Sequence, residues 1–251
     1  MQKQWKHAIV VGASQGIGEA LVYELAAQGV SVALVSRNAD SMSKVAAEAK
    51  KRSDNKGSYY TFVHDVTDFA STPALFQEIT RQLGGLDVII YNAGVMPEVK
   101  QDEFSFETDK KIIDVNVLGA MAWLDEAAKR FRSVEEGTIV GISSIAGERG
   151  RILNPPYHAS KAALSTYLES LRNRLSRHGV TVTTIKPGIV DTAMTKGAAN
   201  TLWIVPAEEV ARQAIAAAKK GVVVKYIPWK WRIISMILHL LPSFIFRRLS
   251  F

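Results

Sequence analysis

The chain has 251 residues, 47% of them hydrophobic and 22% charged, which is an ordinary composition for a soluble globular protein. It has no cysteine, which excludes a disulfide framework and a thiolate metal site, and we expect no metal. The net charge of +7 comes from basic residues scattered along most of the sequence, a pattern that argues against a nucleic-acid partner. The N-terminal residues include no apolar signal-peptide segment, so we expect a cytoplasmic protein.

The apolar run 7–11 predicts a buried parallel strand, and a glycine-rich turn follows it. Glycines between a strand and a helix let the backbone approach a pyrophosphate, which the helix N-terminus stabilises. The spacing differs from the commoner G-x-G-x-x-G fingerprint, but its place after the first strand favours a nucleotide site. The turn reads Gly12-Ala13-Ser14-Gln15-Gly16-Ile17-Gly18, and a helical pattern continues from it to Gln28.

A second strand is predicted over 30–35, and Ser36, Arg37 and Asn38 follow it. In dinucleotide-binding folds an acidic residue near this place binds the ribose 2′-hydroxyl, whereas an arginine accommodates a 2′-phosphate. The first acid after this strand is Asp40, so Arg37 favours NADP(H) over NAD(H). The alternative is a solvated arginine at a strand end.

Two more strands and two more helices come next, the helices over 40–52 and 70–83 and the strands over 59–63 and 86–91. Asp65 follows the earlier strand, where its side chain either meets an adenine edge or caps a turn. The later strand ends at Asn92-Ala93-Gly94, and small residues at a strand end mark the cofactor crevice of a parallel sheet.

A long helix is predicted over 106–131, with Asn116 inside it among apolar residues. Asparagine is a mediocre helix former, and a buried amide needs partners. Asn116 therefore either binds backbone groups or holds a water molecule in a proton path. The strand predicted over 138–142 delivers Ser143 and Ser144 at its carboxyl end, where the active sites of such sheets lie.

Tyr157 and Lys161 are four residues apart near the start of an apolar helical run that ends at about His178. Positions i and i+4 share one helix face, so the phenol and the ammonium group can point into one pocket. A nearby ammonium group favours phenolate, and we expect the pKa of Tyr157 to lie below its usual value of about 10. Such a tyrosine can act as acid and base for a carbonyl/alcohol couple, although Y-x-x-x-K alone also occurs on ordinary helices.

A sixth strand over 180–185 leads to Pro187-Gly188, a turn expected to leave backbone amides free for a nicotinamide carboxamide. The segment 193–205 has no regular pattern. Its apolar residues Met194, Leu202 and Trp203 are candidates for a substrate lid.

A final helix is predicted to begin with Pro206 at its first position and to end near Gly221, before a strand over 222–224. Strands and helices thus alternate without an interdomain linker. This order predicts an α/β fold over residues 1–225: a single Rossmann-like, doubly wound parallel sheet of about seven strands flanked by helices.

Residues 226–251 form an apolar and basic C-terminal extension that is predicted to be helical. Its apolar core, 233–246, has 14 residues, fewer than the roughly 20 needed to span a bilayer. Tryptophans and cations flank that core, which suits peripheral contact with an anionic membrane through residues 229–251, at the inner face of that membrane. The alternative is a helix that covers the substrate pocket or forms a subunit contact, and both roles are compatible.

These motifs, in this order and spacing, resemble the short-chain dehydrogenase/reductase family over about residues 7–225. Three positions depart from the family pattern: Val11, commonly threonine; Tyr91, often asparagine; and Gln15, a basic residue in many NADP-preferring members. The matching motifs are Gly12-x-x-x-Gly16-x-Gly18, Asp65, Asn92-Ala93-Gly94, Asn116, Ser144, Tyr157-x-x-x-Lys161 and Pro187-Gly188.

The resemblance implies a catalytic tetrad. Tyr157 would be the acid/base, and Ser144 would hydrogen-bond the substrate oxygen. Lys161 would lower the pKa of the tyrosine and bind the nicotinamide ribose, while Asn116 would hold a water linking the lysine to solvent. Ser144 is preferred to Ser143 because it lies thirteen positions before Tyr157, the interval usual in the family.

The resemblance also implies the cofactor contacts. Asp65 and Val66 would frame the adenine, Asn92 would support the sheet end beside the ribose, and Ile189 and Thr192 would contact the carboxamide. The full set of candidate NADP(H) contacts is Gly12, Ser14, Gln15, Gly16, Ile17, Gly18, Ser36, Arg37, Asn38, Asp65, Val66, Asn92, Ala93, Gly94, Tyr157, Lys161, Pro187, Gly188, Ile189 and Thr192.

The sequence therefore predicts an NADP(H)-dependent oxidoreductase that interconverts a ketone and a secondary alcohol on a hydrophobic, acyl-chain or steroid-like, substrate. The alternatives are a catalytically silent dinucleotide-binding regulator and a membrane-peripheral scaffold. The intact tetrad favours the enzyme. Family members are usually dimers or tetramers, so we expect a homodimer or homotetramer.

Overall fold

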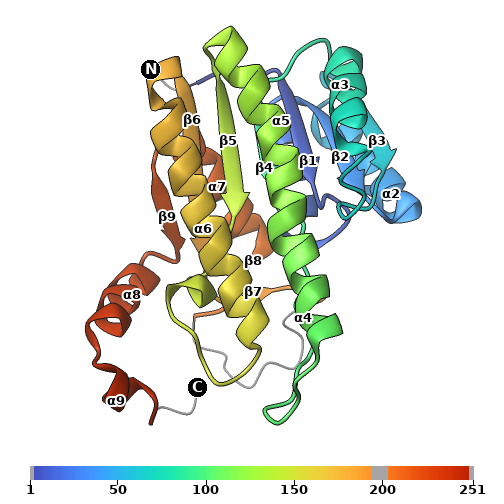
Figure 1. Ribbon diagram of the computed structural model, residues 1–251. Coiled ribbons are helices and arrows are strands. Elements are labelled where there is room, and N and C mark those ends of the chain that lie inside the picture. Colours follow the sequence, from blue (N-terminus) through green and yellow to red (C-terminus); the bar gives the residue numbers. More distant parts are fainter. Residues whose placement is uncertain (1–2, 194–202, 249–251) are drawn as a thin grey trace.

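The computed structural model describes residues 3–193 and 203–248. Its centre is a seven-stranded parallel sheet in the order β3-β2-β1-β4-β5-β6-β9 (Figure 1), which confirms the predicted doubly wound α/β fold. A second sheet pairs the short strands β7 and β8. In chain order the elements are β1 (His7–Val11), α1 (Gly16–Ala27), β2 (Ser31–Ser36), α2 (Ala39–Arg52), β3 (Tyr59–Val63), α3 (Thr72–Leu83), β4 (Val88–Tyr91), α4 (Phe106–Ile113), the π-turn η1 (Asp114–Leu118), α5 (Gly119–Val134), β5 (Gly137–Ile142), the 3₁₀ turn η2 (Ile145–Glu148), α6 (Pro155–Leu175), the 3₁₀ turn η3 (Ser176–His178), β6 (Val180–Pro187), β7 (Val190–Asp191), β8 (Val205–Pro206), α7 (Ala207–Lys219), β9 (Val224–Ile227), α8 (Lys230–Leu240) and α9 (Ser243–Phe246).

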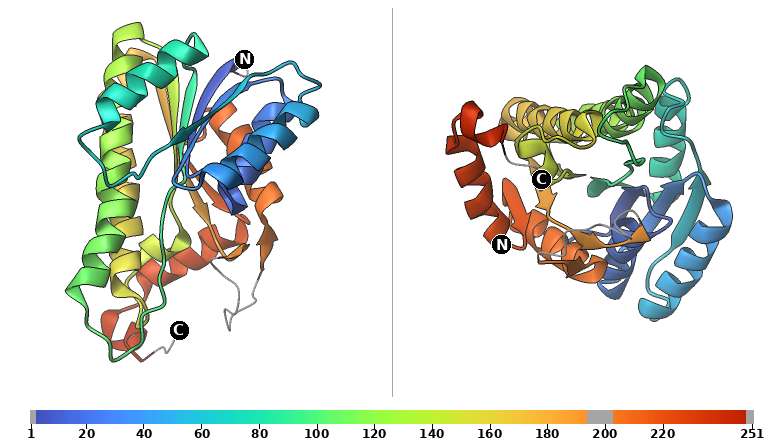
Figure 2. Two further views of the ribbon diagram at one scale, coloured as in Figure 1. Left: turned by 90° about the vertical axis from the view of Figure 1, so that its right-hand side faces the viewer. Right: turned by 90° about the horizontal axis from the view of Figure 1, so that it is seen from below.

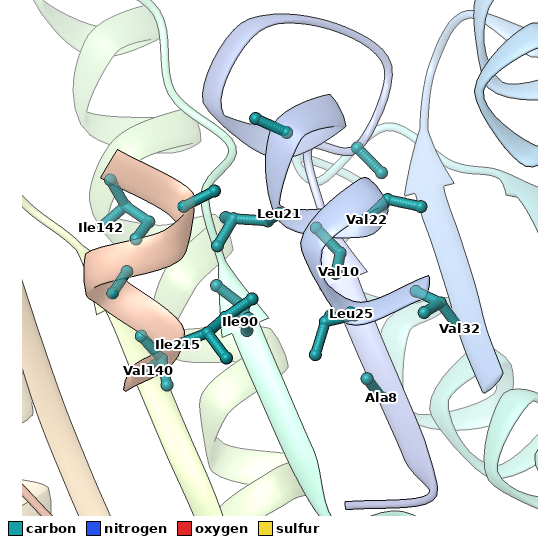
Figure 3. Close-up of a cluster of buried hydrophobic side chains, with 14 of the residues drawn as sticks. Ala8, Val10, Leu21, Val22, Leu25, Val32, Ile90, Val140, Ile142 and Ile215 are labelled. Carbon is teal, nitrogen blue, oxygen red and sulfur yellow. The ribbon is translucent and has the colours of Figure 1, made fainter. Parts of the chain in front are cut away.

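Helices cover both faces of the sheet, as Figure 2 shows in its left-hand view. Alternate strand residues point to opposite faces, so Val10 and Ile9 of β1 enter two different hydrophobic cores. One core joins the sheet to α1, α2 and α7, and Figure 3 shows Leu21 and Leu25 of α1 beside Ile215 of α7 over the strands. The other core joins it to α3, α5 and α6. The strands between them are therefore held rigidly.

The strand order reverses direction between β1 and β4. From β1 the chain adds β2 and β3 on one side, then returns to add β4, β5, β6 and β9 on the other. At such a switch point the connections leave the carboxyl ends of the two central strands in opposite directions and open a crevice between them. Gly12 follows β1 and Asn92 follows β4, so the two small-residue motifs of the sequence lie at this crevice.

Two predicted helices differ from expectation in detail. The long helix predicted over 106–131 is interrupted, since α4 passes through the π-turn η1 into α5, and Asn116 lies in that turn. Pro206 is not the first residue of its helix: it is extended, with φ −62° and ψ 150°, and immediately precedes α7. The reason is that Pro206 and Val205, the last residue of the stretch 193–205 in which no regular element is predicted, form β8 and pair with β7.

The boundary expected at residue 225 falls inside a strand. Tyr226 and Ile227 belong to β9 and pair with Lys186 and Pro187 of β6, so the sheet continues into the predicted extension. The helix α8 follows and lies, with α9, at the end of the molecule where the strands have their carboxyl ends (Figure 1). Within residues 3–193 and 203–248, no helix has both the length and the apolarity to cross a bilayer.

Candidate functional site

A cavity lies at the carboxyl ends of the central strands and brings most of the predicted site together. The predicted residues that line it are Gly12, Ser14, Gln15, Gly16, Ile17, Ser36, Arg37, Asp65, Val66, Asn92, Ala93, Gly94, Tyr157, Lys161 and Thr192. Asn38 lines an adjoining hollow at the start of α2. The remaining candidates are outside the lining: Gly18, Asn116, Ser144, Pro187, Gly188 and Ile189.

The glycine turn is closely packed on the end of β4. Gly12 has φ +86°, and a Cβ there would lie 2.6 Å from the backbone nitrogen of Ala93. The side-chain amide of Asn92 donates to the carbonyl oxygen of Gly12 at 2.9 Å. A Cβ on Gly18 would lie 1.8 Å from that same oxygen, so Gly18 lets α1 pack under the turn instead of lining the cavity. These positions exclude side chains for steric reasons.

The first turn of α1 is open to a ligand. The residue before it, Gln15, makes no capping hydrogen bond with its side chain. Backbone N–H groups at a helix start without such a cap need an acceptor, and the helix dipole favours an anion there. A pyrophosphate is the group that suits this position.

Arg37 lies at the end of β2 and is mostly exposed. It pairs with Asp65 across 3.7 Å. The pKa of Asp65 is lowered, first by the backbone N–H of Thr67, which donates to it at 2.9 Å, and also by Arg37. Asp65 therefore caps a turn, as the second sequence alternative predicted, and also lines the cavity, while its contact with an adenine stays a prediction. Asn38 caps α2 by accepting from the backbone nitrogen of Ser41.

Lys161 of α6 is buried and Tyr157 is half-buried, and both line the cavity. The Lys161 Nζ atom lies 5.7 Å from the centroid of the Tyr157 ring and donates to the carbonyl oxygen of Ile142 at 3.1 Å. Burial lowers the pKa of Lys161 to about 8. The two groups share one helix face, as their spacing predicted.

The expectation that the pKa of Tyr157 lies below 10 is wrong for this arrangement. Burial raises that pKa to about 12, and a hydrogen bond with Ser144 lowers it by a smaller amount. The physical reason is that removing the phenol from water penalises the phenolate more than its neighbours stabilise it. Tyr157 is therefore protonated at neutral pH.

The two serines after β5 have different partners. The Ser143 hydroxyl donates to the carbonyl oxygen of Lys161 at 3.0 Å and contacts the Ser165 hydroxyl at 2.8 Å, which ties the strand end to α6. The Ser144 hydroxyl accepts from the backbone nitrogen of Ala146 at 3.0 Å and hydrogen-bonds Tyr157. Ser144 is thus the serine whose side chain meets the phenol.

Asn116 is fully buried and binds backbone groups. Its Oδ1 accepts from the nitrogen of Val95 at 2.8 Å, and its Nδ2 donates to the carbonyl oxygen of Val95 at 3.0 Å and to the Ser160 hydroxyl at 3.0 Å. The first of the two sequence alternatives is therefore the one observed, and a role in a water path stays a prediction. A Cβ on Gly94 would lie 3.3 Å from Asn116 Oδ1 and 3.5 Å from Lys161 Nζ, so both side chains pack closely against this glycine.

Tyr91, one of the departures from the family pattern, supports the π-turn around Asn116. Its hydroxyl donates to the carbonyl oxygen of Val115 at 2.7 Å. A π-turn disturbs the regular backbone hydrogen bonds of a helix. The Tyr91 side chain therefore supplies a partner where the helix changes its winding.

The Pro187-Gly188 turn differs from expectation. The Gly188 nitrogen donates to the carbonyl oxygen of Ile227 at 2.9 Å, and proline has no N–H, so neither residue offers a free amide. A Cβ on Gly188 would lie 2.0 Å from the indole nitrogen of Trp231, which packs directly on it. The Ile189 carbonyl oxygen accepts from Val205 at 3.1 Å. These contacts make the turn part of the β6–β9 framework.

The lid candidates are only partly described. Met194 and Leu202 lie outside the described residues. Trp203 lies against Trp231 of α8, with ring centroids 5.4 Å apart in an edge-to-face arrangement. Thr192 lines the cavity, and a Cβ on Gly16 would lie 3.2 Å from its methyl group.

Some residues of the lining were not predicted. His64 is buried, stacks edge-to-face with Trp123 at 5.5 Å, and has its pKa lowered by burial. Its position just before Asp65, at the carboxyl end of a predicted strand, is the signal that would have found it. The other unpredicted lining residues are Val35, Val95, Val115, Ile142, Ser143 and Ala193.

Known proteins are similar to this chain in sequence and in fold. The family model described as short chain dehydrogenase matches residues 6–203. An uncharacterized oxidoreductase of Myxococcus xanthus is 32% identical over 250 residues, which covers 98% of this chain and 96% of that protein. One from Mycobacterium tuberculosis (strain ATCC 25618 / H37Rv) is 29% identical over 245 residues, covering 96% of each.

Two solved structures show the same architecture. A short-chain type dehydrogenase/reductase from Mycobacterium ulcerans superposes with a TM-score of 0.82 and 25% identity over 90% of each chain. Levodione reductase superposes with a TM-score of 0.82 and 21% identity, covering 89% of this chain and 97% of that one. The second likeness concerns the fold alone.

Proposed function

Because this chain belongs to the short-chain dehydrogenase family, we propose that it is an NADP(H)-dependent oxidoreductase that interconverts a ketone and a secondary alcohol. One observation carries the proposal. Tyr157 and Lys161 line the same cavity as the glycine turn after β1, and Ser144, which lies outside that lining, hydrogen-bonds Tyr157. That arrangement joins an acid/base group to a site suited to a dinucleotide.

The residues of the cavity fit a nicotinamide dinucleotide. Gly12, Gly16 and Gly94 line the cavity, and the uncapped first turn of α1 suits the pyrophosphate. Tyr157 and Lys161 line the same cavity, where the nicotinamide ribose would reach them. When bound, the nicotinamide supplies or accepts a hydride at the substrate carbon.

Tyr157 would donate the proton in the direction of reduction. Its pKa of about 12 keeps it protonated at neutral pH, ready to protonate a carbonyl oxygen. The Ser144 hydroxyl, already bonded to the phenol, would donate a hydrogen bond to the same oxygen. The Lys161 ammonium group would stabilise the phenolate that remains after the transfer, because it lies 5.7 Å from the ring centroid.

Arg37 is the residue that supports NADP(H). It is exposed at the end of β2, and the hollow it lines also includes Ser14, Ser36 and Asn38 at the start of α2. The 3.7 Å contact with Asp65 is a weak surface pair, so Arg37 can turn to a 2′-phosphate at little cost. No acid occupies the end of β2, which is where a ribose 2′-hydroxyl would be bound.

An apolar substrate is favoured by the loops beside the site. The loops after β4 and β5 meet where the Asn154 side chain donates to the carbonyl oxygen of Pro97 at 2.8 Å. Together they expose Phe104, Ile152 and Leu153. Exposed apolar side chains on two joined loops are typical of a binding surface for hydrophobic groups.

We further propose a homodimer or homotetramer, as is usual in the family, which light scattering would test. The cofactor proposal is tested by titrating the protein with NADPH and with NADH while following its tryptophan fluorescence. Tight NADPH binding and weak NADH binding would support it, and apolar ketones can then be screened for NADPH oxidation. Equal binding of the two would contradict the NADP(H) preference, and binding of neither would favour a protein without turnover.

A further inference from the structure

The helix α8 has two apolar faces, and only one is covered. Trp231 and Leu238 point to the body of the protein and are buried. A second stripe points away at helical spacing and continues into α9. Its members are Ile233, Met236, Ile237, Leu240, Phe244 and Ile245, which are 50%, 60%, 53%, 82%, 58% and 40% exposed.

The covered face is fixed by specific contacts, so α8 cannot turn to bury the other stripe. Trp231 packs on Gly188 and on Trp203. The Arg149 guanidinium donates to the carbonyl oxygens of Leu238 at 2.5 Å and Leu241 at 2.6 Å, which satisfies the carboxyl end of the helix. The outer stripe is therefore a permanent feature of this surface.

Cations border the stripe at both ends. Lys230 and Arg232 begin α8, and Arg247 and Arg248 follow α9; all four are exposed. The sequence has no aspartate or glutamate after Glu209. Glu148, an acid that contacts α8, is largely buried and faces the body of the protein. An apolar stripe between groups of exposed cations, with no acid in the tail itself, is the pattern of a helix that lies in the interface of an anionic membrane.

We propose that α8 and α9 dock this protein on the surface of a bilayer that contains anionic phospholipids. The outer stripe would enter the boundary between headgroups and acyl chains, and the four cations would contact lipid phosphates. A second copy of the chain fits this face poorly. A symmetric contact would place the same cations against each other with no acid of the tail to offset them.

Docking would also orient the molecule. Arg149, which holds α8, is five residues after Ser144, and α8 lies at the end of the molecule where the strands have their carboxyl ends (Figure 1). The cavity would therefore lie close to the lipid surface. Access of lipid-dissolved substrates to the cavity rests on the proposed function, whereas binding of the protein to vesicles does not.

The test is co-sedimentation of the full chain with vesicles of phosphatidylcholine alone and of phosphatidylcholine mixed with phosphatidylglycerol. We expect binding to the mixed vesicles only, and weaker binding at high salt. Ile237→Glu, and separately Arg247→Glu with Arg248→Glu, should each reduce the bound fraction about tenfold or more. Light scattering of every variant reports its oligomeric state.

Matched variants control for charge and folding. Val134→Glu introduces the same acid on an equally exposed apolar residue, 54% against 53% for Ile237. Lys50→Glu with Arg177→Glu makes the same charge change as the double arginine variant on exposed sites of α2 and η3. These controls should bind vesicles as the wild type does. The proposal would be overturned if the protein bound both kinds of vesicle equally, bound neither, or still bound normally with the tail substitutions. It would also be overturned if the tail substitutions dissociated an oligomer while the protein did not bind vesicles.

Discussion

The carboxylate of Glu148 lies 2.7 Å from the ammonium group of Lys186, and both side chains are largely buried. The Tyr226 hydroxyl donates to the same carboxylate at 2.9 Å. Burial acts to raise the pKa of Glu148, but hydrogen bonds from Lys186, Ser235 and Tyr226 together hold it below its ordinary value. One buried charge thus joins η2, β6, β9 and α8, and links the segment after Ser144 to the C-terminal helices.

Replacing this charge should destabilise the fold. Glu148→Gln leaves the Lys186 ammonium group without its ion partner in a largely buried place, and we expect a loss of about 2 kcal/mol in the free energy of unfolding. Urea denaturation measures it. Glu209→Gln, which removes the half-exposed partner of the exposed Arg212, is the matched control and should leave stability nearly unchanged. Equal effects of the two changes would contradict this account.

The effect of Glu148→Gln should also depend on pH. The folded-state pKa of Glu148 is depressed, so its stabilising contribution is present above the unfolded value of about 4.5 and is lost as the pH falls through the folded value. The stability difference between wild type and variant should therefore shrink in acid. A difference that stays constant from neutral to acid pH would show that the charge is not the cause.

Gly12→Ala should damage both stability and cofactor binding. Gly12 and Gly84 both have a positive φ, +86° and +76°, so an alanine at either position is strained by about 1 kcal/mol. Only at Gly12 would the new Cβ also meet backbone, 2.6 Å from the Ala93 nitrogen, whereas nothing lies within 4 Å at Gly84. We expect Gly12→Ala to weaken NADPH binding by about tenfold or more and Gly84→Ala to leave it unchanged. Similar NADPH affinities for both variants would contradict the claim that close packing of the glycine turn is needed for cofactor binding.

Arg37→Ala should change the choice of cofactor. A charge-assisted hydrogen bond to a 2′-phosphate contributes about 1.5–3 kcal/mol, so NADPH affinity should fall about ten- to a hundredfold while NADH affinity stays the same. Fluorescence titration with each cofactor measures both. Lys50→Ala, which removes another exposed cation, on α2, controls for the loss of one charge. Parallel losses for NADPH and NADH would exclude a 2′-phosphate contact.

Ketone reduction should weaken as the pH rises through about 8. The pKa of Lys161 is lowered to about 8 by burial, so its ammonium form is present below that pH and is lost above it. Tyr157, with a pKa of about 12, stays protonated throughout and cannot cause this change. A pH profile of kcat/KM measures it, and the activity that remains in Lys161→Arg should lack the decline because arginine keeps its charge. A wild-type profile that is flat from about pH 6 to 10 would rule out this role.

Local pattern was sufficient for most of the fold. The strands over 7–11 and 59–63 were predicted at the observed bounds, and the crevice followed from small residues after β1 and β4. The order of those motifs also placed Tyr157 and Lys161 on one helix face at the same cavity. These features depend on short-range periodicity and on the rule that parallel strands present their carboxyl ends together.

Features that depend on tertiary packing were missed or misjudged. The π-turn at Asn116 has a helical sequence pattern, and its change of winding is matched by Tyr91 from a distant strand. The raised pKa of Tyr157 results from burial, which spacing on a helix does not report. Glu148 and its partners Lys186, Ser235 and Tyr226 come from four separate segments. None of these can be derived from neighbours in sequence alone.

The most direct test of the proposed function compares wild type with Tyr157→Phe. After a panel of apolar ketones has been screened with NADPH, the rate of NADPH oxidation is measured for both proteins on the best substrate, and NADPH binding is titrated in parallel. We predict that Tyr157→Phe binds NADPH as the wild type does but loses at least about a hundredfold in kcat, because the proton donor is absent. Full turnover by Tyr157→Phe would contradict the proposed mechanism.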